Sequence, residues 1–132
     1  MDSTDAISVT GLTAAQTQLQ VSASNTANMD DTAPLPGSGV SGPAPFVPTR
    51  VETVSLGSGG VQAQLSAADP ASTSTYAPGN PYADSQGMVS TPNVDPVTET
   101  VARMQAVQLY QASAAMLEAN NKMQRTALKM LA

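Results

Sequence analysis

Small and apolar residues recur at helical spacing near the start of the chain. Five of them alternate at spacings of three and four and therefore share one face of a helix: Leu12, Ala15, Leu19, Ser22 and Thr26. The face is thin, and its small residues would let a second helix approach closely. Serines and asparagines near its end lower the intrinsic helicity. The pattern predicts an N-terminal helix, within residues 1–30, that is marginal without a neighbour.

A longer and stronger helical pattern occupies residues 95–132. Asp95 is a good N-cap acceptor, Pro96 suits the first helical position, and Glu99 lies where the helix dipole favours acidic side chains. Basic side chains gather at the far end, where they complement the exposed carbonyl groups. Because no proline or glycine follows Pro96, the pattern predicts one continuous helix of about 36 residues.

Two stripes of side chains run along this predicted helix. The first stripe consists of Val107, Tyr110, Ala114, Leu117, Asn121, Gln124, Leu128 and Leu131. The second consists of Ala106, Leu109, Met116, Met123 and Met130. Two stripes need two or more neighbours, and methionines at helical spacing fill irregular packing far more often than they bind soft metal ions. Asn120 and Asn121 interrupt the apolar face, and they either set the register between helices or face solvent.

The middle of the chain, residues 31–94, contains one clear hairpin pattern. Two alternating segments, Arg50 to Leu56 and Val61 to Ser66, flank the turn sequence GSGG. The Pro-, Gly- and Ser-rich segment before them and the polar segment SAADPASTSTYA after them are predicted to be loops. The sequence therefore predicts an α+β protein, in which long N- and C-terminal helices pack as a coiled-coil-like pair beside a small middle domain of hairpin and loops.

The stretch PGNPYADSQGMVSTPNVDP, residues 78–96, is either an active-site loop or a structural turn. Asp84 begins the turn sequence Asp-Ser-Gln-Gly, with Gly87 at its natural left-handed position. We therefore expect Gly87 to be less replaceable than Gly59 in the hairpin loop. The residues to which we assign turn and cap roles are Gly79, Gly87, Asn93, Asp95 and Pro96.

Composition removes several kinds of chemistry. The chain has no His and no Cys, which excludes Ser-His-Asp triads, Cys-His dyads and the usual zinc sites. A net charge of −5 and 3% aromatic residues give neither a basic stripe nor a stacking platform, so we expect no nucleic-acid partner. The start MDSTDAISVT carries acidic residues where a signal peptide would be basic, and the longest apolar run is too short to span a membrane.

Paired carboxylates could still support glycoside hydrolysis. The candidates are Glu52, Asp69, Asp84, Glu99 and Glu118. Nothing in their spacing pairs any two of them, and Asp84 and Asp95 have structural roles. We therefore expect no catalytic residue, no cofactor and no metal site. Because few large apolar residues are available for a core, partner chains are expected to supply the missing burial.

Four sequence motifs occur together in the chain. They are the bridge YAPGNPYADSQGMVSTPNVDPV, GLTAAQ at residues 11–16, ASNTANMDD at residues 23–31 and a Tyr-x-Ala pattern at residues 110–112. They resemble flagellar basal-body rod proteins, particularly the FlgC family, in which a similar bridge precedes the C-terminal helix and a Ser-Asn-x-Ala-Asn signature occurs. The resemblance covers most of both helical flanks and the bridge.

The resemblance implies a structural subunit that polymerises into the hollow proximal drive shaft, transmits torque and lets exported subunits pass. Such proteins are exported through the flagellar type III apparatus without a cleaved signal peptide, and they assemble in the periplasm. The implied partners are further copies of the chain and rod proteins of the FlgB, FlgF, FlgG and FliE types. The residues expected to pack between subunits are Leu12, Leu19, Asn25, Asn28, Val107, Tyr110, Ala114, Leu117, Asn121 and Leu128.

Three alternatives stay open at this point. Another rod component, such as one of the FlgB type, would share the same architecture. An enzyme that trims peptidoglycan around the rod would show muramidase activity. A flexible adaptor that binds a secretion chaperone through its amphipathic tail would remain in the cytoplasm.

Overall fold

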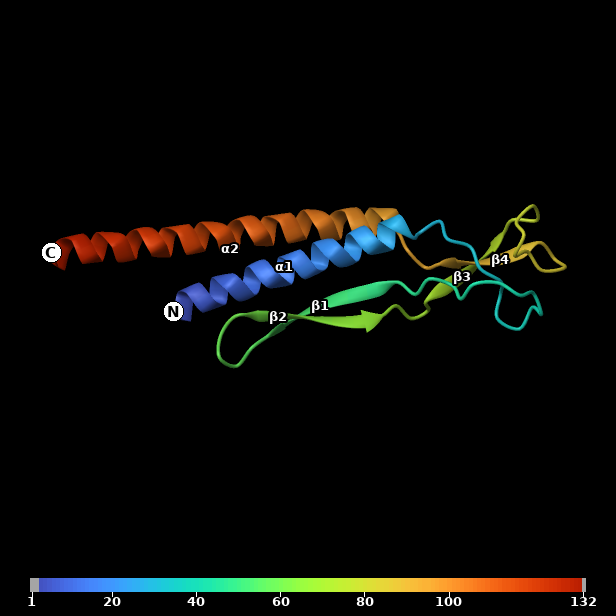
Figure 1. Ribbon diagram of the computed structural model, residues 1–132, viewed down its shortest axis with the longest axis horizontal. Helices are drawn as coiled ribbons and strands as arrows, with labels where there is room; N and C mark the ends of the chain where they lie inside the picture. Colours follow the sequence, from blue (N-terminus) through green and yellow to red (C-terminus); the bar gives the residue numbers. More distant parts are fainter. Residues whose placement is uncertain (1–2, 132) are drawn as a thin grey trace. The chain divides into compact units, whose positions relative to one another are not determined.

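The computed structural model describes residues 3–131, with one long helix at each end and four strands between them (Figure 1). The elements are α1 (Ser3–Ala27), β1 (Thr49–Ser55), β2 (Val61–Ala67), β3 (Ser72–Tyr76), β4 (Met88–Pro92) and α2 (Pro96–Leu131). The strands form two two-stranded sheets, β1 with β2 and β3 with β4. The predicted α+β class is therefore confirmed. The chain divides into two compact units, which are described separately.

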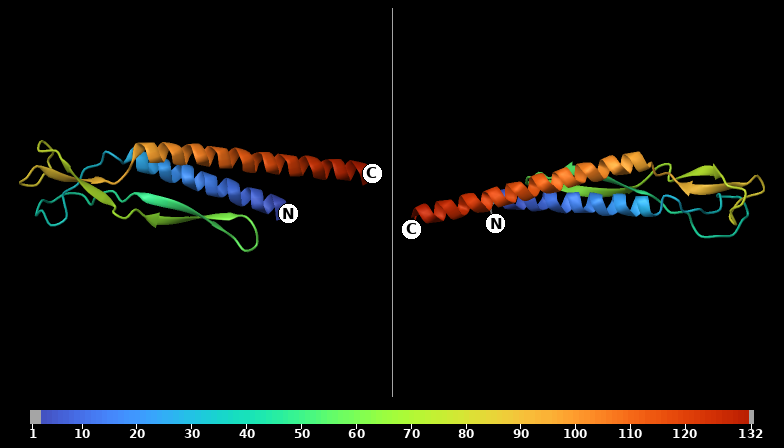
Figure 2. Two further views of the ribbon diagram at one scale, coloured as in Figure 1. Left: turned by 180° about the vertical axis from the view of Figure 1, so that it is seen from behind. Right: turned by 90° about the horizontal axis from the view of Figure 1, so that it is seen from above.

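The first unit, called the helix–hairpin unit, contains residues 3–20, 51–64 and 100–131. α1 lies against α2, and the tip of the β1–β2 hairpin lies against α1 (Figure 1). Figure 2 shows from two further directions that α2 continues past the start of α1. α2 spans 36 residues from Pro96, as its cap and the absence of breakers predict.

The contact between the two helices is made by small side chains. On α1 the buried positions include Ser8, Gly11 and Ala15, which recur at spacings of three and four. On α2 the buried residues are Ala106, Ser113 and Asn120, which recur at a spacing of seven. The stripe predicted for α1 is therefore only partly right, because Ala15 is fully buried whereas Leu12 and Leu19 are half-buried. The smallest residues define the contact because they let the backbones approach each other.

The second unit, called the strand unit, contains residues 21–50 and 65–99. β3 and β4 pair antiparallel, with Ser72 opposite Pro92 and Tyr76 opposite Met88. Ala33 adds a short bridge to the other edge of β4, where it exchanges two main-chain hydrogen bonds with Ser90. Val89 is fully buried in this unit.

The sequence analysis missed both strands of this sheet. It predicted a polar loop where β3 lies, and it treated β4 as part of a turn. β3 has the sequence STSTY, which lacks the apolar alternation that marks a half-buried strand. Its threonines have good β-propensity, and the hydroxyls of Thr73 and Thr75 each share a hydrogen bond with the Thr91 hydroxyl across the sheet.

The β1–β2 hairpin lies within one residue of its predicted bounds. Its turn is closed by hydrogen bonds from Leu56 N to Gly60 O (3.0 Å) and from Gly59 N to Leu56 O (2.9 Å). Gly59 and Gly60 both have positive φ, at 89° and 90°. A side chain at Gly59 is therefore also strained, and it would press against Ile7.

The bridge between β3 and α2 is held by one aspartate and one glycine. The Asp84 carboxylate accepts hydrogen bonds from the main-chain N–H groups of Gln86 (2.8 Å) and Met88 (2.9 Å). Gly87 has φ of 78°, as predicted, and a Cβ there would lie 2.9 Å from the Tyr76 ring. Gly79 has no positive φ and open space around it, so the turn at this position does not require glycine.

We expect Gly87→Ala to lower the free energy of unfolding by about 1–3 kcal/mol, because the new Cβ is strained at positive φ and meets Tyr76. Gly79→Ala is the matched control, and it should leave stability unchanged or slightly raised. Urea unfolding followed by tyrosine fluorescence measures both variants. Equal stabilities of the two variants would contradict the structural role of Gly87.

Candidate functional site

Gly11 of α1 faces the Ser113 side chain of α2. A Cβ built on Gly11 would collide with the Ser113 Oγ and would lie 3.4 Å from the Ser113 Cβ. Ser113 is itself buried, so it has little room to move. The sequence analysis placed Gly11 in the GLTAAQ motif and did not single out Ser113. The helical spacing of Ser8, Gly11 and Ala15 was the signal that could have identified this contact.

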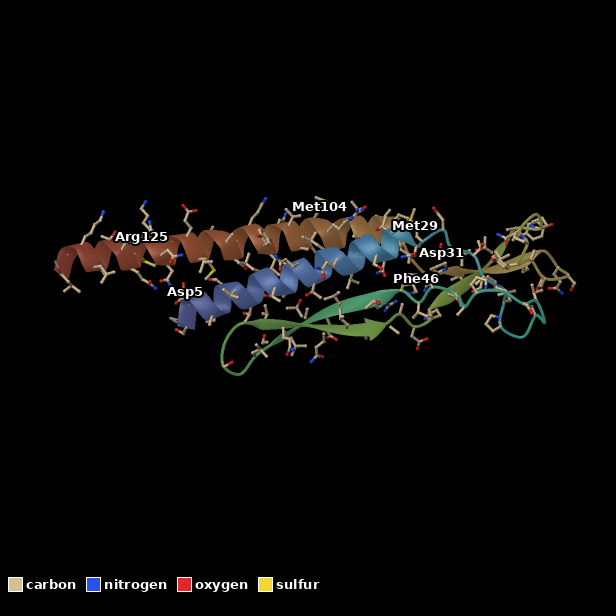
Figure 3. The ribbon with its side chains drawn as sticks, viewed as in Figure 1. Asp5, Met29, Asp31, Phe46, Met104 and Arg125 are labelled. Atoms are coloured by element: carbon tan, nitrogen blue, oxygen red, sulfur yellow. The ribbon has the colours of Figure 1, made fainter. Side chains whose placement is uncertain are left out.

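One asparagine fixes the register of the helices in the helix–hairpin unit. The Asn120 side chain donates a hydrogen bond of 2.7 Å to the Asp5 carboxylate of α1 (Figure 3 labels Asp5). Asn120 is buried, whereas its neighbour Asn121 is exposed. Of the two interpretations given for this pair, contact between helices therefore applies to Asn120 and exposure to solvent applies to Asn121. A buried amide that has one carboxylate partner favours a single alignment of the two helices.

Asn25 performs a similar function in the strand unit. Its side chain donates hydrogen bonds to Thr49 O (2.8 Å) and to the Glu99 carboxylate (2.8 Å), and its Oδ1 accepts one from Thr49 N (3.1 Å). The amide thereby occupies the place of a neighbouring strand beside Thr49. Ser22 adds a hydrogen bond from its hydroxyl to Glu99 O (3.0 Å). Asn25 is thus buried within its own chain, at 4% exposure.

The remaining cap and turn residues occupy structural positions. The Asn28 side chain donates to Ser24 O (2.8 Å) at the end of α1, and the Asn93 side chain donates to Pro70 O (3.0 Å). At the start of α2, the Asp95 carboxylate accepts hydrogen bonds from the Thr98 hydroxyl and from the N–H groups of Thr98 (3.0 Å) and Val97 (3.3 Å). These hydrogen bonds lower the pKa of Asp95 below its usual 3.8, and the Thr98 hydroxyl has a larger effect than either N–H group.

The residues expected to pack between subunits differ in exposure. The half-buried ones are Leu12, Leu19, Asn28, Ala114 and Leu117, and the exposed ones are Val107, Tyr110, Asn121 and Leu128. Met104, Met116 and Met123 are also exposed, and Figure 3 places Met104 on the side of α2 away from α1. α2 thus presents large apolar side chains on faces that α1 does not cover.

Beyond Asn120, which contacts Asp5, α2 continues past the start of α1 (Figure 2). We call residues 121–131 the overhang. Its apolar side chains are strongly exposed: 63% for Met123, 67% for Leu128, 82% for Met130 and 86% for Leu131. Its basic residues are Lys122, Arg125 and Lys129. Figure 3 labels Arg125 on this part of α2, beyond the start of α1.

The described residues contain no cluster of side chains that could bind a metal ion. Among residues 3–131, no three Asp, Glu, His or Cys side chains gather closely enough to hold a metal ion. Of the carboxylates considered for glycoside hydrolysis, Asp84 binds the main chain of its own turn and Glu99 binds Asn25. In the same part of the chain, no helix combines the length and apolarity needed to cross a membrane.

Comparison with known proteins decides the family. Residues 85–130 match the family described as flagellar basal body rod FlgEFG protein C-terminal. The flagellar basal-body rod protein FlgC of Escherichia coli O6:H1 is 36% identical over 119 residues, which cover 84% of this chain and 83% of the relative. The FlgC protein of Salmonella typhimurium is 35% identical and covers 95% and 91%, and that of Bacillus subtilis is 30% identical and covers 93% of each.

The chain belongs to the FlgC family of flagellar basal-body rod proteins. It is therefore a structural subunit of the flagellar basal-body rod, and the resemblance based on its motifs is confirmed. The Ser-Asn-x-Ala-Asn motif contains Asn25, which joins the end of α1 to β1 and to α2. The bridge and α2 together contain the segment matched by the rod family.

Gly11→Val should weaken the contact between α1 and α2, because the added side chain meets Ser113. We expect a loss of about 1–3 kcal/mol in the free energy of unfolding, as for other overpacked sites. Ser113→Gly should recover much of this loss in the double variant. Ala6→Val, at an exposed position of α1, is the control. Thermal melting followed by circular dichroism measures the set, and additive effects of Gly11→Val and Ser113→Gly would contradict the contact.

Asp95→Asn should reduce the dependence of stability on acidic pH. Because folding lowers the pKa of Asp95, its carboxylate stabilises the fold above the unfolded pKa, and this contribution is lost as the pH falls through the folded pKa. Asparagine keeps a capping oxygen but does not titrate. Urea unfolding at neutral pH and at about pH 3 should therefore show a smaller acid-induced loss in the variant than in the wild type. Identical losses would contradict the assigned role.

Proposed function

We propose that the chain polymerises, through α1 and α2, into the hollow proximal shaft of the rod, which transmits torque and lets exported subunits pass. The observation that carries this proposal is the set of large apolar side chains of α2 that are exposed in the described chain, among them Val107, Tyr110, Met116, Met123, Leu128 and Leu131. Contiguous apolar surface of this kind marks an interaction site in a soluble protein.

The energetics favour contacts between subunits. The buried apolar residues of the described chain are five alanines and Val89, so the isolated subunit gains little from its own core. Full burial of one Leu or Met side chain contributes about 1.5–3 kcal/mol. Covering the overhang and the exposed methionines of α2 with helices of neighbouring copies would supply several such contributions.

The proposed packing is coiled-coil-like. The residues Val107, Ala114, Asn121 and Leu128 recur every seven positions, and Tyr110 and Leu117 recur between them. This is the heptad arrangement in which side chains of one helix enter holes on another. The assigned contact residues include Leu12 and Leu19 on α1, which are half-buried in the single chain. Asn25 and Asn28 would contribute by holding α1 in position rather than by touching a neighbour.

Charge supports contacts between copies of the chain. The chain has five basic and ten acidic residues, and three of the basic ones lie in the overhang. The basic end of one subunit therefore finds an acidic surface on the rest of another. We propose that the same surfaces contact rod proteins of the FlgB, FlgF, FlgG and FliE types.

The proposal places the chain in the periplasmic rod, after export by the flagellar type III apparatus. It assigns no catalysis, no cofactor and no nucleic-acid partner to the chain. A peptidoglycan-cleaving enzyme would need two carboxylates facing one cleft, at a separation of about 5–9 Å. Asp84 and Glu99 instead hold a turn and a helix–strand junction together, which supports a structural role for the bridge.

Leu128→Asp should abolish rod assembly without blocking export. Leu128 is 67% exposed in the single chain, so the substitution should leave the subunit fold intact. In the polymer it would bury an unpaired carboxylate, at a cost of at least about 2 kcal/mol for each contact. Thr126→Asp, which adds the same charge at another exposed position of the overhang, is the control.

The expected result is that Leu128→Asp cells secrete the protein but lack rods and motility, whereas Thr126→Asp cells swim. Immunoblots of the medium, electron microscopy of isolated basal bodies and soft-agar swimming measure the three properties. Normal rods in Leu128→Asp cells would show that the overhang faces water in the assembly.

A further inference from the structure

The β1–β2 hairpin has two outer edges, and the hydrogen-bond register shows which residues face them. Leu56 N donates to Gly60 O (3.0 Å), and Ala68 N donates to Pro48 O (2.8 Å) at the other end of the ribbon. Residues whose numbers add to 116 therefore lie opposite each other. The even-numbered residues of both strands point their main-chain groups inward, and the odd-numbered residues point them outward.

Two side chains confirm this alternation and cover one position on each edge. The outward groups of Thr49 on β1 are bound by the Asn25 amide. The outward N–H of Val61 on β2 donates to the Thr10 hydroxyl (3.2 Å). Among the described residues, the outward main-chain groups of Thr53 on β1 and Ala63 on β2 form no hydrogen bond.

The uncovered stretches of these edges lack the charges and prolines that commonly oppose strand addition. Residues 53–68 contain no charged side chain and no proline. Natural proteins protect exposed edges with lysines, prolines, bulges or covering elements, because unpaired N–H and C=O groups accept a further strand. Thr53 on β1 is exposed, whereas on β2 Ala63 is half-buried and Leu65 is 58% exposed.

We propose that the β2 edge of one copy pairs with the β1 edge of a second copy, so that hairpins of neighbouring subunits join into one antiparallel sheet. This inference rests on the proposed function, because the rod is an open polymer. Pairing two unlike edges leaves each copy with one free edge of each kind, which continues a polymer, whereas pairing two like edges closes a dimer.

The sequence of the two strands fits this pairing. β1 and β2 run antiparallel, so the order β1, β2, β1, β2 keeps every neighbouring pair antiparallel. Glu52 on β1 and Gln64 on β2 are opposite each other in the hairpin, on the face with even-numbered side chains. The same alignment between copies places the Glu52 carboxylate beside an amide that can donate to it.

Proline at an outward position tests the contact selectively. Thr53→Pro and Ala63→Pro each remove one outward N–H but none of the inward ladder bonds. Thr53→Val and Ala63→Val keep the N–H and are the matched controls. Each proline variant should be exported with wild-type helix content, and it should give about tenfold fewer rods, as expected when hydrogen bonds are lost at every repeated contact. Both valine variants should assemble normally.

The pattern across variants distinguishes the possible contacts. Loss of rods with Thr53→Pro alone indicates a β1–β1 contact, and loss with Ala63→Pro alone indicates a β2–β2 contact; either result would overturn the proposed pairing. Normal rods with both proline variants would overturn any edge contact while leaving the rod function intact. Absence of the wild-type chain from isolated basal bodies would instead overturn the proposed function.

Cysteine cross-linking tests the same contact without disturbing the edges. The chain has no natural Cys, so copies with Thr53→Cys and copies with Ala63→Cys can be expressed together with different tags. Opposite residues of a hydrogen-bonded antiparallel pair lie about 5.5 Å apart, which permits a disulfide. Oxidation of isolated basal bodies should yield the mixed dimer in preference to either dimer of like copies. If oxidation yields only dimers of two identical variants, or no dimer, the proposed pairing is overturned. This result does not depend on whether the proline variants fold.

Discussion

The close approach of α1 and α2 at Gly11 and Ser113 determines how the rest of the helix–hairpin unit is built. A glycine opposite a serine allows the two backbones to come together, and alanines continue the contact at Ala15 and Ala106. Such a contact is well defined in geometry but buries little apolar area. Within the helix–hairpin unit, the helix pair therefore obtains its alignment from shape and from the partly buried hydrogen bond between Asn120 and Asp5, rather than from large side chains.

A core of this kind explains why the large apolar residues of α2 lie outside it. Met116, Met123 and Leu128 cannot enter a contact that admits only small side chains, so they remain on the surface of the single chain. In an isolated protein this surface would favour aggregation, whereas in a rod subunit it can form contacts between copies. The weakness of the internal core and the exposure of α2 are thus two consequences of one constraint.

Much of the architecture could be predicted from the sequence because its local signals are strong. Asp95 and Pro96 mark the start of α2, and the absence of later breakers gives its length. The GSGG turn between alternating segments locates the hairpin. Gly87 in a turn sequence indicates a positive φ, and Asp84 indicates the hydrogen bonds that hold it.

Other features could not be predicted because they depend on tertiary contacts. β3 is a polar strand that exists through its pairing with β4, so its own sequence resembles a loop. Gly11 lies within a helix, where glycine lowers the stability of the helix, and only the contact with the partner helix explains its presence. Asn25 shows the same limitation, since helical spacing places it on α1 but not beside Thr49 and Glu99.

The two buried asparagines show how a small core specifies its structure. Asn25 and Asn120 each place a side-chain amide against a carboxylate, one in each unit of the chain. Misalignment by one residue would leave a buried amide and a carboxylate without partners, which costs more than the correctly formed bond contributes. The asparagines therefore select one alignment even though they add little net stability. A subunit with so few large buried side chains depends on such selection, because hydrophobic packing alone would not distinguish one alignment of its small residues from the next.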